Sequence, residues 1–362
     1  MTTTQHPAAL DLAGDVVALL RQLIDVESVS GDEALIADLV EAALRPCGHL
    51  EVIRDQNVVV ARTNLGRTDR VVVAGHLDTV PIADNVPSTS TGTGPDELIW
   101  GRGACDMKGG VAVQLSVAVA ATEPSRDVTW VFYDNEEVEE SRNGLARIAR
   151  ERPDYLDASF AVLCEPTNAG IEGGCQGTLR AEVTLRGLAA HSARSWKGHN
   201  AIHDAGEVLQ RLAAYEAQQV DVDGLVYREG LNAVAISGGI AGNVIPDRCT
   251  VAVNYRFAPD KDAAAATAHV EQVFAGHDVV VTDVAEGARP GLDRPAAAEF
   301  VAAVGGQTSA KFGWTDVARF AARGVPAVNF GPGDPSKAHA DDEFCPAADV
   351  RHCRDALLRW LS

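Results

Sequence analysis

The segment Val71-Val-Val-Ala-Gly-His76-Leu-Asp78 decides the fold of this chain. Its first part is a short apolar run bounded by turn residues, which predicts a buried strand. A histidine and an aspartate follow just past the carboxyl end of that strand, where open α/β sheets build their sites. An imidazole can bind a metal through one ring nitrogen while a neighbouring carboxylate accepts the other ring N–H. The pattern His-x-Asp by itself is weak, because a capped turn explains it more simply.

The sequence on both sides of this strand alternates between helical and strand patterns. Helices are predicted where apolar residues recur at helical spacing, and the one that follows Ser30 and Glu33 is expected to begin with a capping box. The alternation predicts an α/β domain with a largely parallel sheet. The helices are expected at 10–26, 34–44, 107–121 and 139–150, and the strands at 58–61, 71–75, 128–132 and 160–163.

The pattern changes near residue 177. The order of elements becomes β-α-β-β-α-β, which is typical of a ferredoxin-like unit, and α/β character returns after residue 289. The smaller domain is therefore predicted at 177–289, inserted between two parts of the larger one at 1–176 and 290–362. Its strands are expected at 179–185, 232–237, 249–257 and 279–284 and its helices at 201–215 and 262–274; the last part should contain helices at 314–322 and 348–361 and a strand at 327–330.

Composition excludes several classes of protein. A length of 362 residues favours two domains, since single cores stop growing at roughly 250–300 residues. The formal net charge of −20, without any cluster of Lys and Arg, argues against a nucleic-acid partner. Seven cysteines without a Cys-x-x-Cys pair predict reduced thiols in a cytoplasmic protein. The start of the chain lacks signal-peptide features, and the longest apolar stretch, 111–121, is too short to span a membrane.

Four further motifs place acids or a histidine at strand ends or beside glycine turns. Each has a simple structural explanation, such as an N-capping aspartate or a solvated acidic loop. Adjacent carboxylates repel each other unless a cation lies nearby, so one ligand and one proton shuttle is a natural division of roles. Two imidazoles and three carboxylates suit Zn²⁺, Co²⁺ or Mn²⁺ without a thiolate. The candidate metal ligands and proton shuttle, in addition to His76, are Asp106, the pair Glu136 and Glu137, Glu165 and His339.

These motifs, taken together, resemble those of the M20 zinc peptidase/deacylase family in their order and context. The resemblance covers nearly the whole chain. The segments that carry it are His76-Leu-Asp78, Gly101-Arg-Gly-Ala-Cys-Asp-Met-Lys-Gly-Gly110, Glu136-Glu137, Cys164-Glu-Pro-Thr167 and Ala338-His339.

The resemblance implies a di-zinc aminopeptidase-like α/β catalytic domain with an inserted ferredoxin-like lid that forms a homodimer. It implies a small-molecule N-acyl amino acid as substrate. Glu136 would be the general base and Asp78 would orient His76. One zinc ion would be held by His76, Asp106 and Glu165 and the other by Asp106, Glu137 and His339, with Co²⁺ or Mn²⁺ as possible substitutes.

Segments of the inserted domain and of the last part of the chain also resemble the family. His191 matches the lid histidine that reaches the partner's active site. At Gln176 the chain departs from many related enzymes, in which a basic residue meets a substrate carboxylate. The expected substrate-binding residues are Asn243, Arg256, Gly313, Thr315 and Arg319.

Two alternatives concern the site itself. Cys105 and Cys164 adjoin presumed ligands, but neighbours along a strand point to opposite faces, so both thiols are expected to pack behind the site. A protein that binds metal without catalysis is a different class of explanation. Glu136 argues against it, because a carrier needs no base beside its ligands.

Overall fold

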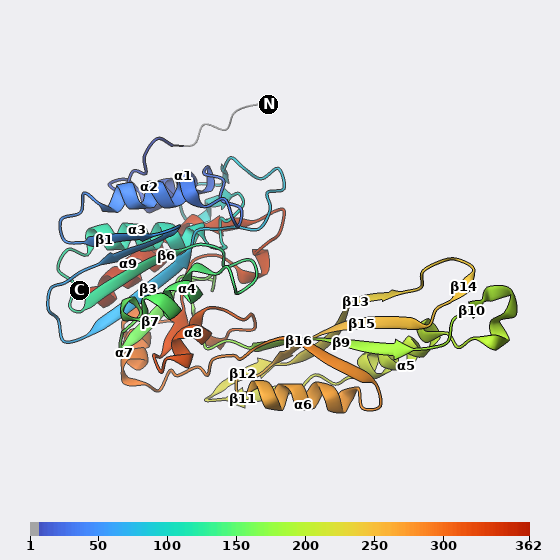
Figure 1. The fold of residues 1–362 in the computed structure, drawn as a ribbon. Helices are drawn as coiled ribbons and strands as arrows, with labels where there is room; N and C mark the ends of the chain where they lie inside the picture. Colours follow the sequence, from blue (N-terminus) through green and yellow to red (C-terminus); the bar gives the residue numbers. More distant parts are fainter. Residues whose placement is uncertain (1–6) are drawn as a thin grey trace. The chain divides into compact units, whose positions relative to one another are not determined.

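The chain forms two compact units in a computed structural model that describes residues 7–362 (Figure 1). The first unit contains the chain up to Gly173 together with Pro290–Ser309 and Arg319–Ser362. The second consists of Gly174–Arg289 and Ala310–Ala318. Residues 310–318 thus pack with the second unit, although the sequence groups them with the last part of the larger domain.

The first unit is built on a mixed eight-stranded sheet in the order β1-β2-β6-β3-β7-β18-β8-β17. The four strands from β6 to β18 run parallel, whereas β1, β2 and β8 pair antiparallel. The strands are β1 (Glu51–Asp55), β2 (Val58–Arg62), β3 (Arg70–His76), β6 (Asp127–Tyr133), β7 (Phe160–Leu163), β8 (Ile171–Gly173), β17 (Thr308–Ala310) and β18 (Ala327–Asn329). A separate small sheet joins β4 (Thr89–Thr91), β5 (Leu98–Trp100) and β19 (Phe344–Pro346).

Helices cover this sheet and bury its apolar strands. Every residue of β6 is buried, and so is every residue of β3 after Arg70. Strands buried on both faces have nearly continuous apolar sequences, as these two do. Helix α3 packs against α1 and α9. The helices are α1 (Val16–Ile24), α2 (Ala34–Leu44), α3 (Lys108–Ala120), α4 (Gly144–Glu151), α7 (Pro295–Val304), α8 (Val317–Ala322) and α9 (Ala347–Leu361).

Polar caps decide where two helices begin. The sequence predicts the first helix from residue 10, but α1 begins after Asp15, whose carboxylate accepts a hydrogen bond from Val17 N. Likewise α4 begins after Asn143, which accepts from Ala146 N, and not at residue 139. In both cases the side-chain cap satisfies a helix amide that has no intrahelical partner. Helix α7, with a proline in its first turn, was not anticipated from the apolar pattern.

A glycine brings α3 against the carboxyl end of β7. A Cβ atom on Gly110 would lie 2.0 Å from the carbonyl oxygen of Cys164, far inside contact distance. Only glycine allows the helix to approach the strand end this closely. The glycine pair after Lys108 therefore serves packing next to Glu165.

The second unit has a four-stranded antiparallel sheet in the order β13-β15-β9-β16. Helices α5 and α6 pack on one face of it around a core of alternate strand residues such as Val251, Val253 and Tyr255. In chain order the elements are β9 (Gly177–Arg186), α5 (Ala201–Ala213), β13 (Gly230–Gly238), β15 (Arg248–Phe257), α6 (Ala263–Val273) and β16 (Asp278–Ala285). Two short pairs join β10 (Ala190–His191) to β14 (Val244–Ile245) and β11 (Gln219–Val222) to β12 (Leu225–Arg228).

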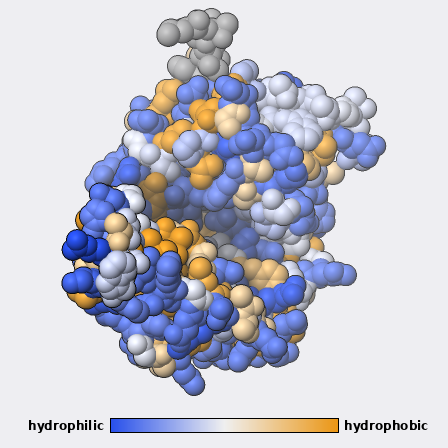
Figure 2. All heavy atoms as spheres, turned by 90° about the vertical axis from the view of Figure 1, so that its right-hand side faces the viewer, coloured by the Kyte–Doolittle hydropathy of each residue, from blue (hydrophilic) through white to orange (hydrophobic). Residues whose placement is uncertain are grey.

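Hydrophilic residues predominate on the face of the molecule in Figure 2, and apolar residues form small groups among them. This agrees with the strongly acidic composition. Within residues 7–362, none of the helices has the length and apolar character needed to cross a membrane.

Candidate active site

Three neighbouring parallel strands bring His76, Glu165 and the pair Glu136 and Glu137 to one edge of the sheet, whereas Asp106 and His339 lie in turns outside it. In the registers, Ala74 of β3 pairs with Leu163 of β7, and His76 pairs with Tyr133 of β6. Glu165 follows Leu163 by two residues, so it stands at the level of His76 on the adjacent strand, and neighbouring strands lie about 4.8 Å apart. Glu136 and Glu137 come three and four residues after Tyr133, in the loop that follows β6.

The Asp106 carboxylate lies between two imidazoles. Its Oδ1 is 3.2 Å from Nε2 of His76, and its Oδ2 is 3.3 Å from Nε2 of His339. The same Nε2 of His339 lies 2.9 Å from Oε1 of Glu137. Ligand atoms of His76, Asp106 and Glu137 all fall within 4.8 Å of one another. One carboxylate that faces two imidazoles has the arrangement of a bridging ligand, with one oxygen for each of two ions.

Asp78 contacts His76 and the backbone of both glutamates. Nδ1 of His76 is 3.0 Å from the backbone oxygen of Asp78 and 3.5 Å from its Oδ1, so the main-chain oxygen is the nearer partner. The carboxylate also accepts hydrogen bonds from the backbone N–H groups of Glu136 (3.0 Å) and Glu137 (3.1 Å). Asp78 therefore fixes the backbone of both glutamates in addition to the imidazole.

Ser30 and Glu33 do not form the expected capping box. Glu33 is the N-cap residue of α2, but its side chain makes no capping hydrogen bond. The Ser30 hydroxyl donates instead to Oδ2 of Asp78 (2.7 Å), and the buried Glu33 carboxylate accepts from Gly31 N (2.8 Å) and Asn135 N (3.2 Å). The Ser-x-x-Glu spacing predicts a capping box, but both side chains bind groups that lie elsewhere in the fold.

Two ligand segments have left-handed backbone conformations. Asn135 has φ 58° and His339 has φ 66°, and such values are uncommon for residues other than glycine. Hydrogen bonding of Asn135 N to Glu33 holds the first of these turns directly before Glu136. Conformations of this kind concentrate at functional sites.

The electrostatics of the cluster favour a cation. Hydrogen bonds to Asp106 and Glu137 raise the pKa of His339 to about 10. Burial opposes protonation of His76, but hydrogen bonds to Asp106 and Asp78 outweigh it and raise its pKa well above the usual value. Burial would raise the pKa of Asp106, yet hydrogen bonds from both histidines hold it well below the usual range. Burial and the nearby Asp106 carboxylate raise the pKa of Glu137.

The donor set therefore fits divalent cations of the zinc class. Imidazole and carboxylate are common ligands of such ions, and a cation would relieve the crowding of negative charge. The two thiols beside the ligands do not compete, because Cys105 and Cys164 are buried in the apolar core and burial raises the pKa of both.

The predicted substrate-binding residues fall in both units. In the second unit, His191 of β10 pairs with Val244, and Ser192 N donates to the carbonyl of Asn243, so Asn243 lies beside His191 directly before β14. Nδ1 of His191 accepts a hydrogen bond from Ala193 N (3.1 Å), which leaves the proton of the neutral ring on Nε2.

Arg256 occupies the sheet face opposite the two helices. It alternates with the inward-facing Tyr255 and Phe257 and pairs in register with Thr178. Burial and the nearby Arg180 guanidinium lower the pKa of Arg256. No carboxylate within residues 7–362 forms an ion pair with it. Arg180 is not among the residues predicted from the sequence to bind substrate. Strand alternation nevertheless places it on the same sheet face as Arg256.

The other candidates have varied surroundings. Gln176 is buried and donates from Nε2 to the carbonyl of Arg228 (2.7 Å), so it serves the interior of the second unit. Gly313 is exposed, whereas Thr315 is buried. In the first unit, Arg319 donates from Nη1 to Oε1 of Glu140 (3.0 Å).

Comparison with known proteins identifies the family. Residues 72–362 match the model of peptidase family M20/M25/M40. The chain belongs to this family. A protein of Mycobacterium tuberculosis, provisionally named succinyl-diaminopimelate desuccinylase DapE, is 56% identical over 97% of this chain and 99% of its own length. The succinyl-diaminopimelate desuccinylase of Corynebacterium glutamicum is 47% identical over 98% of each chain.

Solved structures share the M20 fold at low identity. A tripeptidase of Staphylococcus aureus has a TM-score of 0.77 at 20% identity over 98% of both chains. The YXEP protein of Bacillus subtilis, described as a dinuclear metal binding peptidase from the M20 family, has a TM-score of 0.70 at 16% identity over 96% of both chains. The α/β fold of the predicted family is thus confirmed, with a mixed sheet in place of a largely parallel one.

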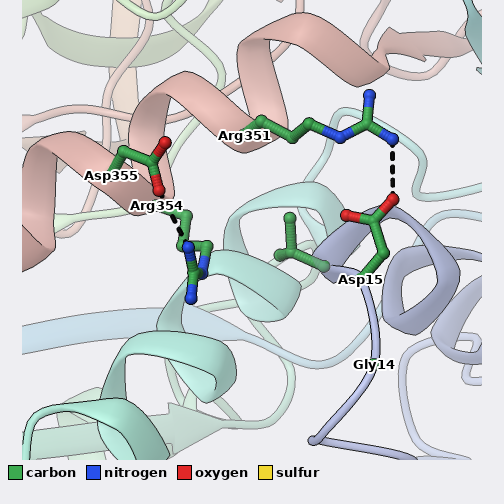
Figure 3. A pocket seen from close by; sticks show the side chains of 6 residues that line it. Gly14, Asp15, Arg351, Arg354 and Asp355 are labelled. Atoms are coloured by element: carbon green, nitrogen blue, oxygen red, sulfur yellow. Dashed lines mark hydrogen bonds and ion pairs between the residues drawn. The ribbon is translucent and has the colours of Figure 1, made fainter. Parts of the chain in front are cut away.

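A pocket elsewhere in the first unit of this M20 protein offers no comparable chemistry. It lies where α1 begins, next to α9 (Figure 3). Its charges are already paired, because Arg351 donates to Asp15 (2.6 Å) and Arg354 to Asp355 (2.8 Å). The cluster around Asp106 is therefore the candidate active site.

We predict that binding of Zn²⁺ to the metal-free protein releases protons and strengthens as pH rises. His339, with a pKa of about 10, is protonated at pH 7, and a coordinated imidazole must be neutral. Affinity should increase by up to about tenfold per pH unit for each displaced proton until the pH reaches that pKa. Calorimetric titration in buffers of different ionisation enthalpy counts these protons.

His339→Gln should lower the number of protons released, whereas His352→Gln on the exposed side of α9 should not. Zinc binding that is independent of pH between 6 and 8 would contradict this description of the site.

Proposed function

We propose that this chain is a succinyl-diaminopimelate desuccinylase. It would hydrolyse N-succinyl-LL-2,6-diaminopimelate to succinate and LL-2,6-diaminopimelate in lysine and diaminopimelate biosynthesis. The observation that carries the proposal is the identity of 47% over 98% of both chains with the Corynebacterium glutamicum enzyme of that name. The biosynthetic role and seven free thiols favour the cytoplasm as its compartment.

The site would hold two zinc ions, or Co²⁺ or Mn²⁺ in their place. His76, Asp106 and Glu165 would hold one ion, and Asp106, Glu137 and His339 the other. The two oxygens of Asp106, each directed at a different imidazole, support the shared role. Such ions lower the pKa of a bound water and polarise a carbonyl oxygen.

Glu136 would act as the general base. It would accept a proton from the attacking water and deliver that proton to the leaving amine nitrogen as the amide C–N bond breaks. Its side chain is half-buried, its charge contributes to the raised pKa of His76, and Asp78 holds its backbone N–H. Glu137, which is hydrogen-bonded to His339, would be a ligand and so differ from Glu136 in role.

Arg256 would bind the succinyl carboxylate. The guanidinium is partly buried, carries no ion pair within residues 7–362 and lies near a second arginine, Arg180, so an anion there would be stabilised. This supplies the positive charge that Gln176 does not. Asn243, Gly313, Thr315 and Arg319 are proposed to contact the rest of the substrate.

The second unit would be a ferredoxin-like lid, corresponding to the domain predicted at 177–289, and would form a homodimer. Its strand order β13-β15-β9-β16 supports this description. Strand β13 lies at the edge of the sheet and exposes Val234 (64%) and Ile236 (51%). An exposed apolar edge strand is an aggregation hazard unless it is covered, and a second copy of β13 would cover it.

His191 would stabilise the developing oxyanion of the partner subunit's reaction. The hydrogen bond from Ala193 N to Nδ1 places the ring proton on Nε2, which makes Nε2 a donor. Its position on the exposed β10 leaves it accessible to a partner.

Glu136→Gln keeps the shape of the side chain but removes the base. We predict that kcat falls by about 10²–10⁴ while the metal content, measured by elemental analysis, stays near that of the wild type. Glu137→Gln is the matched control. It should lower the metal content, which Glu136→Gln leaves nearly unchanged. Equal effects of the two substitutions on both quantities would contradict the division of roles.

Arg256→Met should raise KM for N-succinyl-diaminopimelate by about 10–100-fold, because a charge-assisted hydrogen bond is lost. It should have little effect on an N-acetyl substrate, which lacks that carboxylate. Arg186→Met, on the same strand face as Arg180 but paired with Asp278, is the control and should change neither KM. Steady-state kinetics on both substrates measures this, and faster turnover of N-acetylornithine by the wild type would favour an acetylornithine deacetylase instead.

His191→Ala should lose kcat while it retains metal. Mixing His191→Ala with Glu136→Gln chains should restore roughly a quarter of wild-type activity, since half of the dimers would be mixed and each would have one intact site. His199→Ala, in which a histidine paired with Asp204 is lost, is the control on the same loop. Mixed dimers, verified by native mass spectrometry, without recovered activity would refute the role across the dimer.

A further inference from the structure

The buried carboxylate of Glu343 organises the loop that ends in Asp106. The side chain is 1% exposed and accepts four hydrogen bonds. Oε1 accepts from Cys105 N (3.0 Å) and Asp106 N (3.1 Å), and Oε2 accepts from Gly103 N (3.0 Å) and Arg102 Nη1 (3.0 Å). All four donors belong to one short segment that leads into the bridging aspartate.

Arg102 ties the same segment to the chain that carries His339. Its guanidinium, 3% exposed, donates from Nη1 to the carbonyl of Ala340 (3.0 Å) as well as to Glu343. The backbone N–H of Gly101 donates to the carbonyl of Glu343 (3.1 Å). The Arg102–Glu343 pair therefore joins the two loops that supply Asp106 and His339.

We propose that Glu343 is a positioning residue of the metal centre, which holds the Asp106 carboxylate at bridging distance from His339. Glu343 lies four residues after His339 in the chain and binds the backbone N–H of Asp106. A shift of that backbone would move both carboxylate oxygens, which lie 3.2 and 3.3 Å from the two imidazoles. The proposal rests on the proposed metal centre and deepens it.

Four converging donors require a group that only accepts hydrogen bonds. An ionised carboxylate meets this need with two oxygens, each of which takes two donors. A glutamine has nearly the same volume, but its NH₂ group would face two N–H donors and leave them unsatisfied. Partners that orient metal ligands in this way typically change metal affinity by about 10–100-fold when they are lost.

Asp127 provides a matched control in the same unit. It is 4% exposed and accepts from Leu65 N (2.8 Å), Arg67 N (2.9 Å) and Thr63 Oγ1 (2.9 Å). It stands at the start of β6, whereas the glutamates of the site follow the other end of that strand. Asp127→Asn thus removes a comparable buried carboxylate far from the ligands.

The experiment compares the full-length wild type with Glu343→Gln and Asp127→Asn. Zn²⁺ affinity is measured by competition with a chelator, the ligand field by the absorption spectrum of the Co²⁺-loaded protein, and stability by thermal unfolding. Glu343→Gln should weaken Zn²⁺ binding by about 10–100-fold, because both proposed ions share Asp106, and it should alter the Co²⁺ spectrum, with kcat reduced more than KM is raised. Asp127→Asn should lower thermal stability while leaving affinity and spectrum as in the wild type.

Arg102→Lys serves as a second variant if Glu343→Gln does not fold. It keeps the charge but cannot reach Glu343, Ala340 and Pro81 together, so a smaller loss of Zn²⁺ affinity is expected. Equal losses of metal affinity in Glu343→Gln and Asp127→Asn, or wild-type affinity and spectrum in Glu343→Gln and Arg102→Lys, would overturn the positioning role. A wild-type chain that binds no divalent ion would refute the metal centre itself.

Discussion

The site depends on one carboxylate that is shared by two imidazoles. Asp106 directs Oδ1 at His76 and Oδ2 at His339, so its position decides whether both imidazoles meet the same carboxylate. His76, Asp106 and His339 come from distant parts of the chain. The loops that carry them must therefore be held in place for both distances to be kept. Much of the first unit can be understood as the support that this geometry requires.

That support consists of buried carboxylates that accept backbone N–H groups. Glu343 binds the segment before Asp106, Asp78 binds the amides of Glu136 and Glu137, and Glu33 binds the amide of Asn135. Each interaction fixes the main chain of a loop at a strand end and leaves the functional side chain unobstructed. Loops are otherwise the most mobile part of a fold, so these contacts allow a precise site to be built from them.

The concentration of acids at this site favours the binding of a cation. Protons on the imidazoles balance the nearby carboxylates in the absence of a metal, since hydrogen bonds to those carboxylates raise the pKa of His76 and His339. A metal would replace those protons. Affinity for the ion and the pH of the solution are therefore coupled through the same histidines.

The sequence by itself determined the alternation of helices and strands, the family, and the candidate ligands, because apolar periodicity and residues at strand ends leave local patterns. It could not determine the partners of Ser30 and Glu33, whose spacing suggested a capping box but whose side chains bind Asp78 and Asn135. Nor could it reveal that Glu343 binds the loop before Asp106. Tertiary structure alone decided these contacts, because a buried polar side chain pairs with whichever donor the fold brings to it, and that donor can lie anywhere along the chain.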